Sequence, residues 1–490
     1  MKQILTAMQM RQADQATIDG GVSAFDLMQR AGRAVADTAQ KVAPDTGRMV
    51  IVVGGGNNGG DGYAAATTLS GMKVRVTVVA LSDPEKLTGA AAEHARLAAQ
   101  SGAKIRMACK SDDRDVLSFW LTRAVLVLDA VFGTGLDREL TGWMREAIGI
   151  INASDRPVMS VDMPSGIHSD NGRVMGAAIE ADWTLPIAAV KWGHWLGAGR
   201  QHHGRLLPPA DIGIIIGEME SDACMLDDSL FKRLVTQDLP DMHKGSFGHV
   251  WVFGGSEGFA GAPRLASLGA MAVHAGLVSI ACPDDVYAPI AGASLEAMVH
   301  RQGKAVWKHA DVLLAGPGWG TGQQALLASL LESDRPLLLD ADALNMLALD
   351  HGLLADAAAR SALTVFTPHP GEAGRLLGCT SAEVQQDRPE ALQALVEKLH
   401  GWVVLKGEQT LIGSPDGSIR LCPFGSNRLA TAGSGDVLAG MLAGLLAQGL
   451  PVELALCGGV ALHGKAGEVG GWYRAGQLPD RVADVRQRLC

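Results

Sequence analysis

Apolar runs that end in small or polar residues alternate with helix-like stretches through most of this chain. Residues 1–43 are expected to be helical, with a break at Gly20-Gly21. Strand-like runs follow at 48–53, 74–80, 124–128 and 157–161, and helices are expected from about Tyr63 and at 88–100. Such alternation predicts a parallel, doubly wound α/β sheet, because parallel strands are joined by crossover helices.

The pattern loosens between residues 208 and 245 and then begins again. A chain of 490 residues is too long for one core, so we place a boundary near 215–228 and expect domains at 1–220 and 228–490. Strands of the second half are expected at 249–253, 278–281, 312–315, 337–339, 363–366 and 403–405, and helices from about Ala262, at 435–447 and at 452–467.

Composition narrows the class of protein. Hydrophobic residues make up 47%, aromatic residues only 4%, and there are 61 glycines, which favours an α/β protein with tight turns over a β-sandwich. A net charge of −10 without a run of Lys or Arg argues against nucleic acid as a partner. No apolar run reaches membrane-spanning length, and seven scattered cysteines without a C-x-x-C pair indicate reduced thiols. We therefore expect a cytoplasmic enzyme or binding protein.

Polar residues of the first half gather where strands end. Residues 54–62, Gly-Gly-Gly-Asn-Asn-Gly-Gly-Asp-Gly, follow a strand, and Asp129 and Asp162 follow two others. Parallel strands place these ends at one sheet edge, where ligands of doubly wound sheets bind. Taken singly, the loop could be a plain turn and each Asp a helix cap. Together with Asn58 and Ser165 they form an oxygen-rich set that suits a hard cation.

Three motifs carry a resemblance over residues 1–215: Gly-Gly-Asn-Asn-Gly-Gly-Asp-Gly, Asp-Ala-Val-Phe-Gly-Thr-Gly-Leu and Val-Asp-Met-Pro-Ser-Gly. In this order they resemble the NAD(P)H-hydrate epimerase domain. Met163 stands where Ile is more usual, a change between apolar residues. The resemblance implies a potassium ion at Asn58, Asp129 and Ser165. It implies that the hydrated dinucleotide is bound by Asn57, Asn58, Gly59, Gly60, Asp61, Gly133, Thr134, Gly135, Leu136, Asp137, Arg138, Glu139 and Asp162.

The second half has a different loop, Thr-Ala-Gly-Ser-Gly-Asp at 431–436. Small residues at a helix start let backbone N–H groups close around a phosphoryl group. Asp436 is then placed to take a proton from a hydroxyl, although an Asp there could also be a helix cap. Thr-Pro-His-Pro-Gly-Glu at 367–372 presents His369, and Lys-Gly-Glu-Gln-Thr at 406–410 is a candidate nucleotide contact.

These motifs, with His-Lys-Gly-Ser-Phe-Gly-His at 243–249 and Gly-Pro-Gly at 316–318, resemble the nucleotide-dependent NAD(P)H-hydrate dehydratases of ribokinase-like α/β/α fold. The resemblance covers residues 228–490. Ala432 departs from it, since these enzymes more often have Gly there, and the local string is then closer to a sugar kinase. The resemblance implies that Ala262, Gly318, His369 and Asp436 face the hydrate, and that the nucleotide is bound by Lys406, Gly407, Glu408, Gln409, Thr410 and Gly435.

The interpretation is a bifunctional enzyme with a Rossmann-like N-terminal domain, which repairs hydrated NADH and NADPH. The first domain would epimerise R and S hydrates. The second would dehydrate the S form with ADP or ATP, and magnesium is expected to accompany the nucleotide. Asp436 is the expected base of dehydration. Asp162 is the first acid–base candidate of epimerisation and Lys191 the second, although a lysine is more often a surface residue. A homo-oligomer is expected. Two alternatives stay open, a small-molecule kinase with a regulatory Rossmann-like domain and a non-enzymatic nucleotide sensor.

Overall fold

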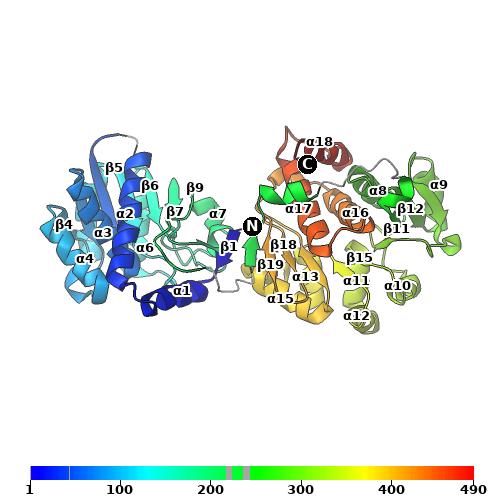
Figure 1. Ribbon diagram of the computed structural model, residues 1–490, viewed down its shortest axis with the longest axis horizontal. Coiled ribbons are helices and arrows are strands. Elements are labelled where there is room, and N and C mark those ends of the chain that lie inside the picture. Colours follow the sequence, from blue (N-terminus) through cyan, green and yellow to red (C-terminus); the bar gives the residue numbers. More distant parts are fainter. Residues whose placement is uncertain (1, 44, 217–222, 235–242, 490) are drawn as a thin grey trace. The chain divides into compact units, whose positions relative to one another are not determined.

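The structure, a computed structural model, describes residues 2–43, 45–216, 223–234 and 243–489 (Figure 1). Contacts divide the chain into an N-terminal unit of residues 3–221 and a C-terminal unit that contains residues 222–490. Each unit is built around its own largely parallel sheet with helices on both faces, so the predicted α/β class is confirmed. The boundary expected near 215–228 includes residues 217–222, which lie outside the described residues. Within the described ranges, no helix is both long and apolar enough to cross a membrane.

The N-terminal sheet has the order β4-β3-β2-β5-β6-β7-β9, with every described pair parallel. Strands β1 and β8 also pair in parallel, with Leu5 opposite Lys191. The strands are β1 Lys2–Leu5, β2 Arg48–Val53, β3 Arg75–Ala80, β4 Lys104–Met107, β5 Ala124–Ala130, β6 Val158–Val161, β7 Trp183–Leu185, β8 Val190–Lys191 and β9 Arg205–Leu206. Because β2, β5 and β6 are neighbours, their carboxyl ends meet at one edge.

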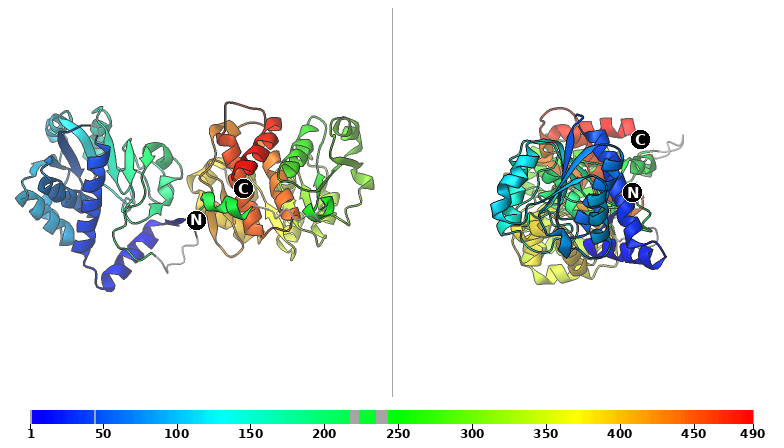
Figure 2. Two further views of the ribbon diagram at one scale, coloured as in Figure 1. Left: turned by 45° about the horizontal axis from the view of Figure 1, so that its top comes forward. Right: turned by 90° about the vertical axis from the view of Figure 1, so that its left-hand side faces the viewer.

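Helices cover both faces of this sheet (Figure 2). Met49, Ile51 and Val53 of β2 pack in a cluster with residues of α2, α3 and α4, while Val50 and Val52 pack with residues of α5 and α6, as the alternation of side chains along a strand requires. The helices are α1 Ala7–Asp19, α2 Ala24–Val42, α3 Asn57–Gly71, α4 Gly89–Gln100, α5 Arg114–Leu121, α6 Gly142–Asn152 and α7 Gly199–His202, with 3₁₀ turns η1 Pro84–Lys86, η2 Ser111–Asp113 and η3 Trp192–His194.

The structure corrects two expectations in this unit. Residues 2–5 form a strand rather than helix, because β1 finds a partner in β8, which is distant in sequence. Helix α3 begins at Asn57 rather than near Tyr63, so the Gly/Asn loop supplies the first turns of the helix itself. A Cβ at Gly59 would collide with the Gly54 carbonyl oxygen, so the tight passage from β2 into α3 depends on glycine there.

The C-terminal sheet runs β13-β12-β11-β14-β15-β16-β17-β18-β19-β10. Its pairs are parallel from β13 to β17, antiparallel across β17, β18 and β19, and parallel again between β19 and β10. The strands are β10 Ala223–Met225, β11 His249–Phe253, β12 Leu277–Cys282, β13 Met298–Arg301, β14 Val312–Ala315, β15 Leu337–Leu339, β16 Thr364–Phe366, β17 Trp402–Leu405, β18 Leu411–Gly413 and β19 Ile419–Leu421.

A large core on one face of this sheet joins the strands to α8, α16, α17 and α18, and Figure 1 shows α10, α11, α13 and α15 on the other side of the sheet. The helices are α8 Gly261–Ala272, α9 Asp284–Ala291, α10 Gln324–Leu331, α11 Ala341–Leu349, α12 His351–Ala358, α13 Pro370–Leu377, α14 Ser381–Gln386, α15 Arg388–Leu399, α16 Ser434–Ala447, α17 Val452–Glu468 and α18 Leu478–Leu489. The 3₁₀ turns are η4 Asp228–Arg233, η5 Lys244–Phe247, η6 Gln302–Lys304, η7 Asn427–Leu429 and η8 Ala475–Gln477.

Candidate active sites

Asp129 and Ser165 form a fixed polar pair at the carboxyl edge of the N-terminal sheet. Asp129 lies inside β5 and is fully buried. Its carboxylate accepts hydrogen bonds from the Ser165 hydroxyl at 2.5 Å, the Ser165 backbone N–H at 2.9 Å and the Ser160 hydroxyl at 2.8 Å. Burial raises the pKa of Asp129, and the hydrogen bonds from Ser165 and Ser160 oppose that rise. The pair is thus an oxygen-rich group of fixed geometry.

Asn58, in the first turn of α3, is only 8% exposed, yet neither its side-chain oxygen nor its nitrogen has a hydrogen-bond partner among the residues that the structure describes. A Cβ on Gly133 would lie 3.3 Å from the Asn58 side chain, and the preceding Phe132 N–H donates to the Ser165 hydroxyl at 2.8 Å. The 132–133 turn therefore connects Asn58 to the Asp129–Ser165 pair. Because a buried unsatisfied amide is costly, this amide is suited to a ligand. The three oxygens expected to bind potassium fit that ion in donor type.

Asp162 is held in an unusual backbone conformation, with φ at +67°. Its Oδ1 accepts hydrogen bonds from the Lys191 ammonium and from the Ile187 backbone N–H at 3.0 Å, and its carbonyl oxygen lies 2.7 Å from His194 Nε2. Oδ2 faces Gly133, at 3.3 Å from the position of a Cβ there. One oxygen of Asp162 is therefore anchored, and the other faces the loop that was expected to bind substrate.

Lys191, the second acid–base candidate, is 1% exposed and is therefore not the surface residue that a lysine usually is. Its ammonium bonds Asp162 and, at 2.7 Å, the Ile187 carbonyl oxygen. The Lys191 backbone N–H donates to His194 Nδ1 at 3.0 Å, so His194 Nε2 carries the proton that it donates to the Asp162 carbonyl. Burial lowers the pKa of His194 to about 4 and keeps it neutral. The arrangement identifies Lys191 as the partner that fixes Asp162.

The remaining expected residues of this site differ in exposure. Gly59 and Gly60 are buried, Asp61 is half-buried and Asn57 is exposed. In the loop after β5, Leu136 is buried, Gly133 and Thr134 are half-buried, and Gly135, Asp137, Arg138 and Glu139 are exposed. The loop is thus anchored by the buried Leu136 and exposed to solvent at 137–139.

Asp162 and Lys191 have two charged neighbours, of which Asp61 was expected at this site and Asp14 was missed from the sequence. Asp14, half-buried on α1, and Asp61 on α3 both interact electrostatically with Asp162 and Lys191. Burial raises the pKa of Asp14 to about 6 and raises that of Asp61 well above its usual range. An Asp on an amphipathic helix has no sequence signal that separates it from a solvated one. His194 was also missed, since only the fold brings it under Asp162.

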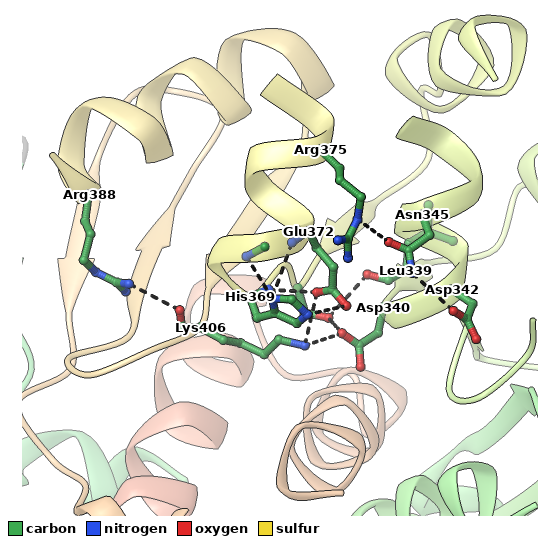
Figure 3. Close-up of polar contacts among 11 residues, drawn as sticks. Leu339, Asp340, Asp342, Asn345, His369, Glu372, Arg375, Arg388 and Lys406 are labelled. Carbon is green, nitrogen blue, oxygen red and sulfur yellow. Dashed lines mark hydrogen bonds and ion pairs between the residues drawn. The ribbon is translucent and has the colours of Figure 1, made fainter. Parts of the chain in front are cut away.

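In the C-terminal unit, Lys406 lies at the centre of a carboxylate cluster (Figure 3). Its Nζ is 2.5 Å from Asp340 Oδ1 and 3.8 Å from Glu372 Oε2. The Thr367 hydroxyl donates to the same Asp340 oxygen at 2.7 Å. Burial alone would lower the pKa of Lys406, but Asp340 and Glu372 outweigh it, so the pKa is raised and the lysine stays cationic. Loops after β15, β16 and β17 thus converge on one cation.

His369 is the N-cap of α13, a helix that begins at Pro370. Its Nδ1 accepts the Gly371 backbone N–H at 2.9 Å, and its Nε2 lies 3.3 Å from Glu372 Oε1. The backbone N–H of His369 donates to Glu372 Oε2 at 2.8 Å. The imidazole is half exposed while Glu372 is buried, so His369 presents a ring edge to solvent on a fixed support, as a ligand contact requires.

Asp436 lies in the first turn of α16, directly after a left-handed Gly433. Burial raises its pKa to about 7, with Asp340 adding to the rise and Lys406 opposing it. A Cβ on Gly435 would be 3.5 Å from Lys406 Nζ, so the helix start lies against the cation. At the same helix start, the Ser434 hydroxyl oxygen lies 3.2 Å from Nε2 of the buried His463. The structure therefore brings together three expected residues, Lys406, Gly435 and Asp436.

Ala262 and Gly318 are neighbours, because a Cβ on Gly318 would lie 2.9 Å from that of Ala262. The loop containing Gly318 reaches the Lys406 cluster through Asp342, which accepts the Gly320 backbone N–H at 2.8 Å. Asp342 is also among the charges that raise the pKa of Asp436. The residues expected to face the hydrate thus share one edge of the C-terminal sheet.

The expected nucleotide loop, 406–410, is held by Arg388 of α15. The guanidinium donates to the carbonyl oxygens of Leu405 at 3.1 Å, Lys406 at 3.4 Å and Gln409 at 3.4 Å. A Cβ on Gly407 would lie 2.5 Å from this guanidinium, at a φ of +144°. Within the loop, Lys406 and Thr410 are half-buried, Gly407 and Glu408 are exposed, and Gln409 is buried.

Asp340 and Glu372 were not assigned to the site from sequence. Asp340 directly follows the apolar strand β15, in the same way that Asp162 follows β6. The rule that selected Asp162 would therefore have found Asp340. Glu372 stood inside a recognised motif, but the sequence does not reveal that its carboxylate turns inward to Lys406.

Comparisons with known proteins match the two units to two different family models. Residues 24–193 match the family model of the YjeF-related protein N-terminus, and residues 250–483 match the model of NAD(P)H-hydrate dehydratase, in line with the predicted ribokinase-like domain. A crystallised ADP/ATP-dependent NAD(P)H-hydrate dehydratase from Bacillus subtilis, obtained with ATP and Mg²⁺, is 30% identical, with a TM-score of 0.49 over 54% of this chain and 98% of its own.

Relatives along the whole length are similar as well. The bifunctional NAD(P)H-hydrate repair enzyme Nnr of Coxiella burnetii is 35% identical over 94% of this chain and 93% of its own length. The corresponding enzyme of Escherichia coli is 32% identical over 92% and 86%. With both units matched at this identity and coverage, the chain belongs to the family of bifunctional NAD(P)H-hydrate repair enzymes.

Proposed function

We propose that this chain repairs hydrated NADH and NADPH, epimerising R and S hydrates in residues 1–220 and dehydrating the S form in residues 228–490 with ADP or ATP. The observation that carries the proposal is a polar site at the sheet edge of each unit, in a chain whose full-length relatives are bifunctional repair enzymes. A kinase with a regulatory first domain would not need the unpartnered Asn58 beside an anchored Asp162.

The epimerase substrate carries a hydroxyl at C6 of the nicotinamide ring, so inversion at C6 needs a group that exchanges protons there. We assign that role to Asp162, whose Oδ2 faces Gly133, while Lys191 holds the other oxygen. The start of α3 and the 133–139 loop would bind the dinucleotide, whose phosphates suit the N–H groups of a helix N-terminus.

Potassium is proposed at Asn58, Asp129 and Ser165, where it would supply a fixed positive charge beside the dinucleotide. A single carboxylate among three oxygens is sparse for tight binding of a divalent ion. We expect potassium chloride to raise the melting temperature of the wild-type protein more than choline chloride at equal ionic strength. Asp129→Asn should remove that difference. An equal response of both proteins to the two salts would contradict the assignment.

Dehydration follows as phosphoryl-transfer chemistry. Asp436 takes the proton of the C6 hydroxyl, and the resulting oxygen attacks the terminal phosphoryl group of the nucleotide. The N–H groups around 433–435 and the Lys406 cation stabilise the charge that develops on that group. Phosphate then leaves C6 with its oxygen, a proton leaves C5, and the ring double bond is restored. Magnesium is proposed to enter with the nucleotide phosphates, which commonly supply most of its protein-site ligands besides water.

The test uses the full chain and pure R hydrate. Without nucleotide, the R form should convert to S and no NADH should appear. With ATP or ADP, NADH should accumulate and both hydrates should disappear. NADH formation that needs no nucleotide, or R hydrate that stays at its spontaneous rate of epimerisation, would overturn the proposal.

We also propose that the protein is cytoplasmic. The six described cysteines are free thiols, which suits the reducing cytoplasm. A homo-oligomer is proposed as well, and light scattering of the purified protein after size-exclusion chromatography would test it.

A further inference from the structure

The charged groups around Asp162 include one that the proposed mechanism leaves unused. Asp14 comes from α1, an element outside the expected site, and within the described residues it has no hydrogen-bond or ion-pair partner. It nevertheless interacts electrostatically with Lys191 and Asp162. A carboxyl group that the fold holds near an ion pair, without a bond of its own, is available for another molecule.

The fold fixes where Asp14 lies. Strand β1 pairs with β8 so that Leu5 is opposite Lys191, and α1 follows β1 directly. Leu5, Met10 and Ala13 form a buried cluster with Ala189, two residues before Lys191. The N-terminus of α1 is tied at its other side by the Asp170 carboxylate, which accepts the Ala7 backbone N–H at 2.6 Å. The fold therefore holds α1, and Asp14 on it, beside the strand that carries Lys191.

A second observation, the unpartnered side chain of Asn58, also indicates that a ligand binds beside Asp162. Asn58 is more than nine-tenths buried, and both polar atoms of its side chain lack a partner among the described residues. A Cβ on Gly133 would lie 3.3 Å from the Asn58 side chain and 3.3 Å from Asp162 Oδ2, so the two side chains face the same space. Lys191 is a poor proton carrier, because its ammonium already donates to Asp162 Oδ1 and to the Ile187 carbonyl oxygen. The site therefore contains one anchored carboxylate, Asp162, and two carboxyl groups, Asp14 and Asp61, that have no hydrogen-bond or ion-pair partner within the described residues.

We propose that Asp14 is the second acid–base group of the epimerase, paired with Asp162 across the C6 carbon of the hydrate. This inference rests on the proposed location of the epimerase site. One carboxyl group donates its proton to the C6 hydroxyl, the C6–O bond breaks, and water leaves while the N1 electron pair forms an N1=C6 bond. Water then adds to the opposite face and gives its proton to the other carboxylate. The protein gives one proton and regains one, and the C6 oxygen now comes from solvent.

The experiment measures full-length protein with pure R hydrate, without nucleotide, in H₂¹⁸O. Asp14→Asn should lower both the appearance of S hydrate and the uptake of ¹⁸O by about a hundred-fold or more, as expected for loss of an acid–base group. Asp14→Glu, which keeps a carboxyl group, should recover part of the rate. Asp19→Asn is the matched control, since Asp19 is an exposed Asp at the end of the same helix, bonded to Gln15, and it should react as the wild type does.

The outcomes separate this inference from the proposed site. Wild-type rates in Asp14→Asn while Asp162→Asn is inactive overturn the role of Asp14 alone. Wild-type rates in both variants overturn the proposed site and Asp14 with it. Loss of activity in Asp61→Asn combined with a fully active Asp14→Asn also overturns the inference. A folding defect is excluded by the melting profile and by unchanged dehydration of S hydrate with ATP in Asp14→Asn.

Discussion

Asp436 and Glu372 are both carboxyl groups whose pKa burial raises to about 7. Repulsion by Asp340 adds to both rises and Glu372 adds to the rise at Asp436, while Lys406 opposes the rise in both groups. A base must be ionised before it accepts a proton, so a carboxyl group with this pKa is only partly competent at neutral pH. If Asp436 is the proposed base, we therefore expect its protonation in the free protein to limit dehydration on the acid side.

We expect kcat/KM for dehydration of S hydrate to rise with pH through about 7 and then level off. Glu372→Gln removes a negative charge that raises the pKa of Asp436, so the same limb should move to lower pH. Stopped assays of NADH formation between pH 5.5 and 9 measure both. A profile that falls with pH across this range, or a limb that moves upward in Glu372→Gln, would contradict the assignment of Asp436 as base.

At the scale of single residues, some features of the sites could be predicted from the sequence and others could not. Asp129, Asp162 and Asp436 were predictable, because each follows a recognisable strand end or helix start. The burial of Lys191 was not, because its partner Asp162 lies 29 residues away in sequence and joins it only through the fold. Asp14 could not be found either, since a helix pattern does not distinguish a carboxyl group aimed at a site from one in water.

At the scale of elements, the alternation of strands and helices predicted both sheets and the shared edge of β2, β5 and β6. Two elements, β1 and the start of α3, were predicted wrongly, and both depend on contacts with other parts of the fold. Strand β1 has four residues and pairs with the two-residue β8, so nothing in its own pattern specifies it. The start of α3 contains Asn and Gly, which are weak helix formers, and the helix forms there because β2 and β5 fix the turn that precedes it.

Arg388 connects helix α15 to the expected nucleotide loop. Its guanidinium donates hydrogen bonds to three carbonyl oxygens of the 405–409 segment. Lysine carries a single ammonium group and cannot reproduce that fork. We expect Arg388→Lys to raise the KM for ATP about ten-fold or more while epimerisation without nucleotide is unchanged. Initial rates of dehydration at varied ATP measure this effect.

Arg360→Lys is the matched control for that experiment. Arg360 also bonds carbonyl groups, those of Leu330 at 3.1 Å, Ser333 at 2.9 Å and Arg335 at 2.8 Å, but away from the nucleotide loop. Its replacement should lower the melting temperature without a selective effect on ATP. Equal ATP dependence in the two variants would show that Arg388 has a purely structural role.

At the scale of the whole molecule, the proposed function requires two separate active sites in one chain. Each unit has its own sheet, its own core and its own polar edge. The epimerase makes the R hydrate available to a dehydratase that accepts the S form, so both epimers leave by one route. Full-length variants that lack one activity should therefore keep the other.

The most direct test mixes two such variants, Asp162→Asn and Asp436→Asn, with pure R hydrate and ATP. Neither alone should form NADH faster than spontaneous epimerisation allows, because the first cannot make S hydrate and the second cannot dehydrate it. Together they should form NADH steadily, with the S hydrate made by Asp436→Asn consumed by Asp162→Asn. NADH formation by either variant alone at the wild-type rate would contradict two separate sites. So would a mixture that forms no NADH although Asp436→Asn epimerises R hydrate and Asp162→Asn dehydrates pure S hydrate.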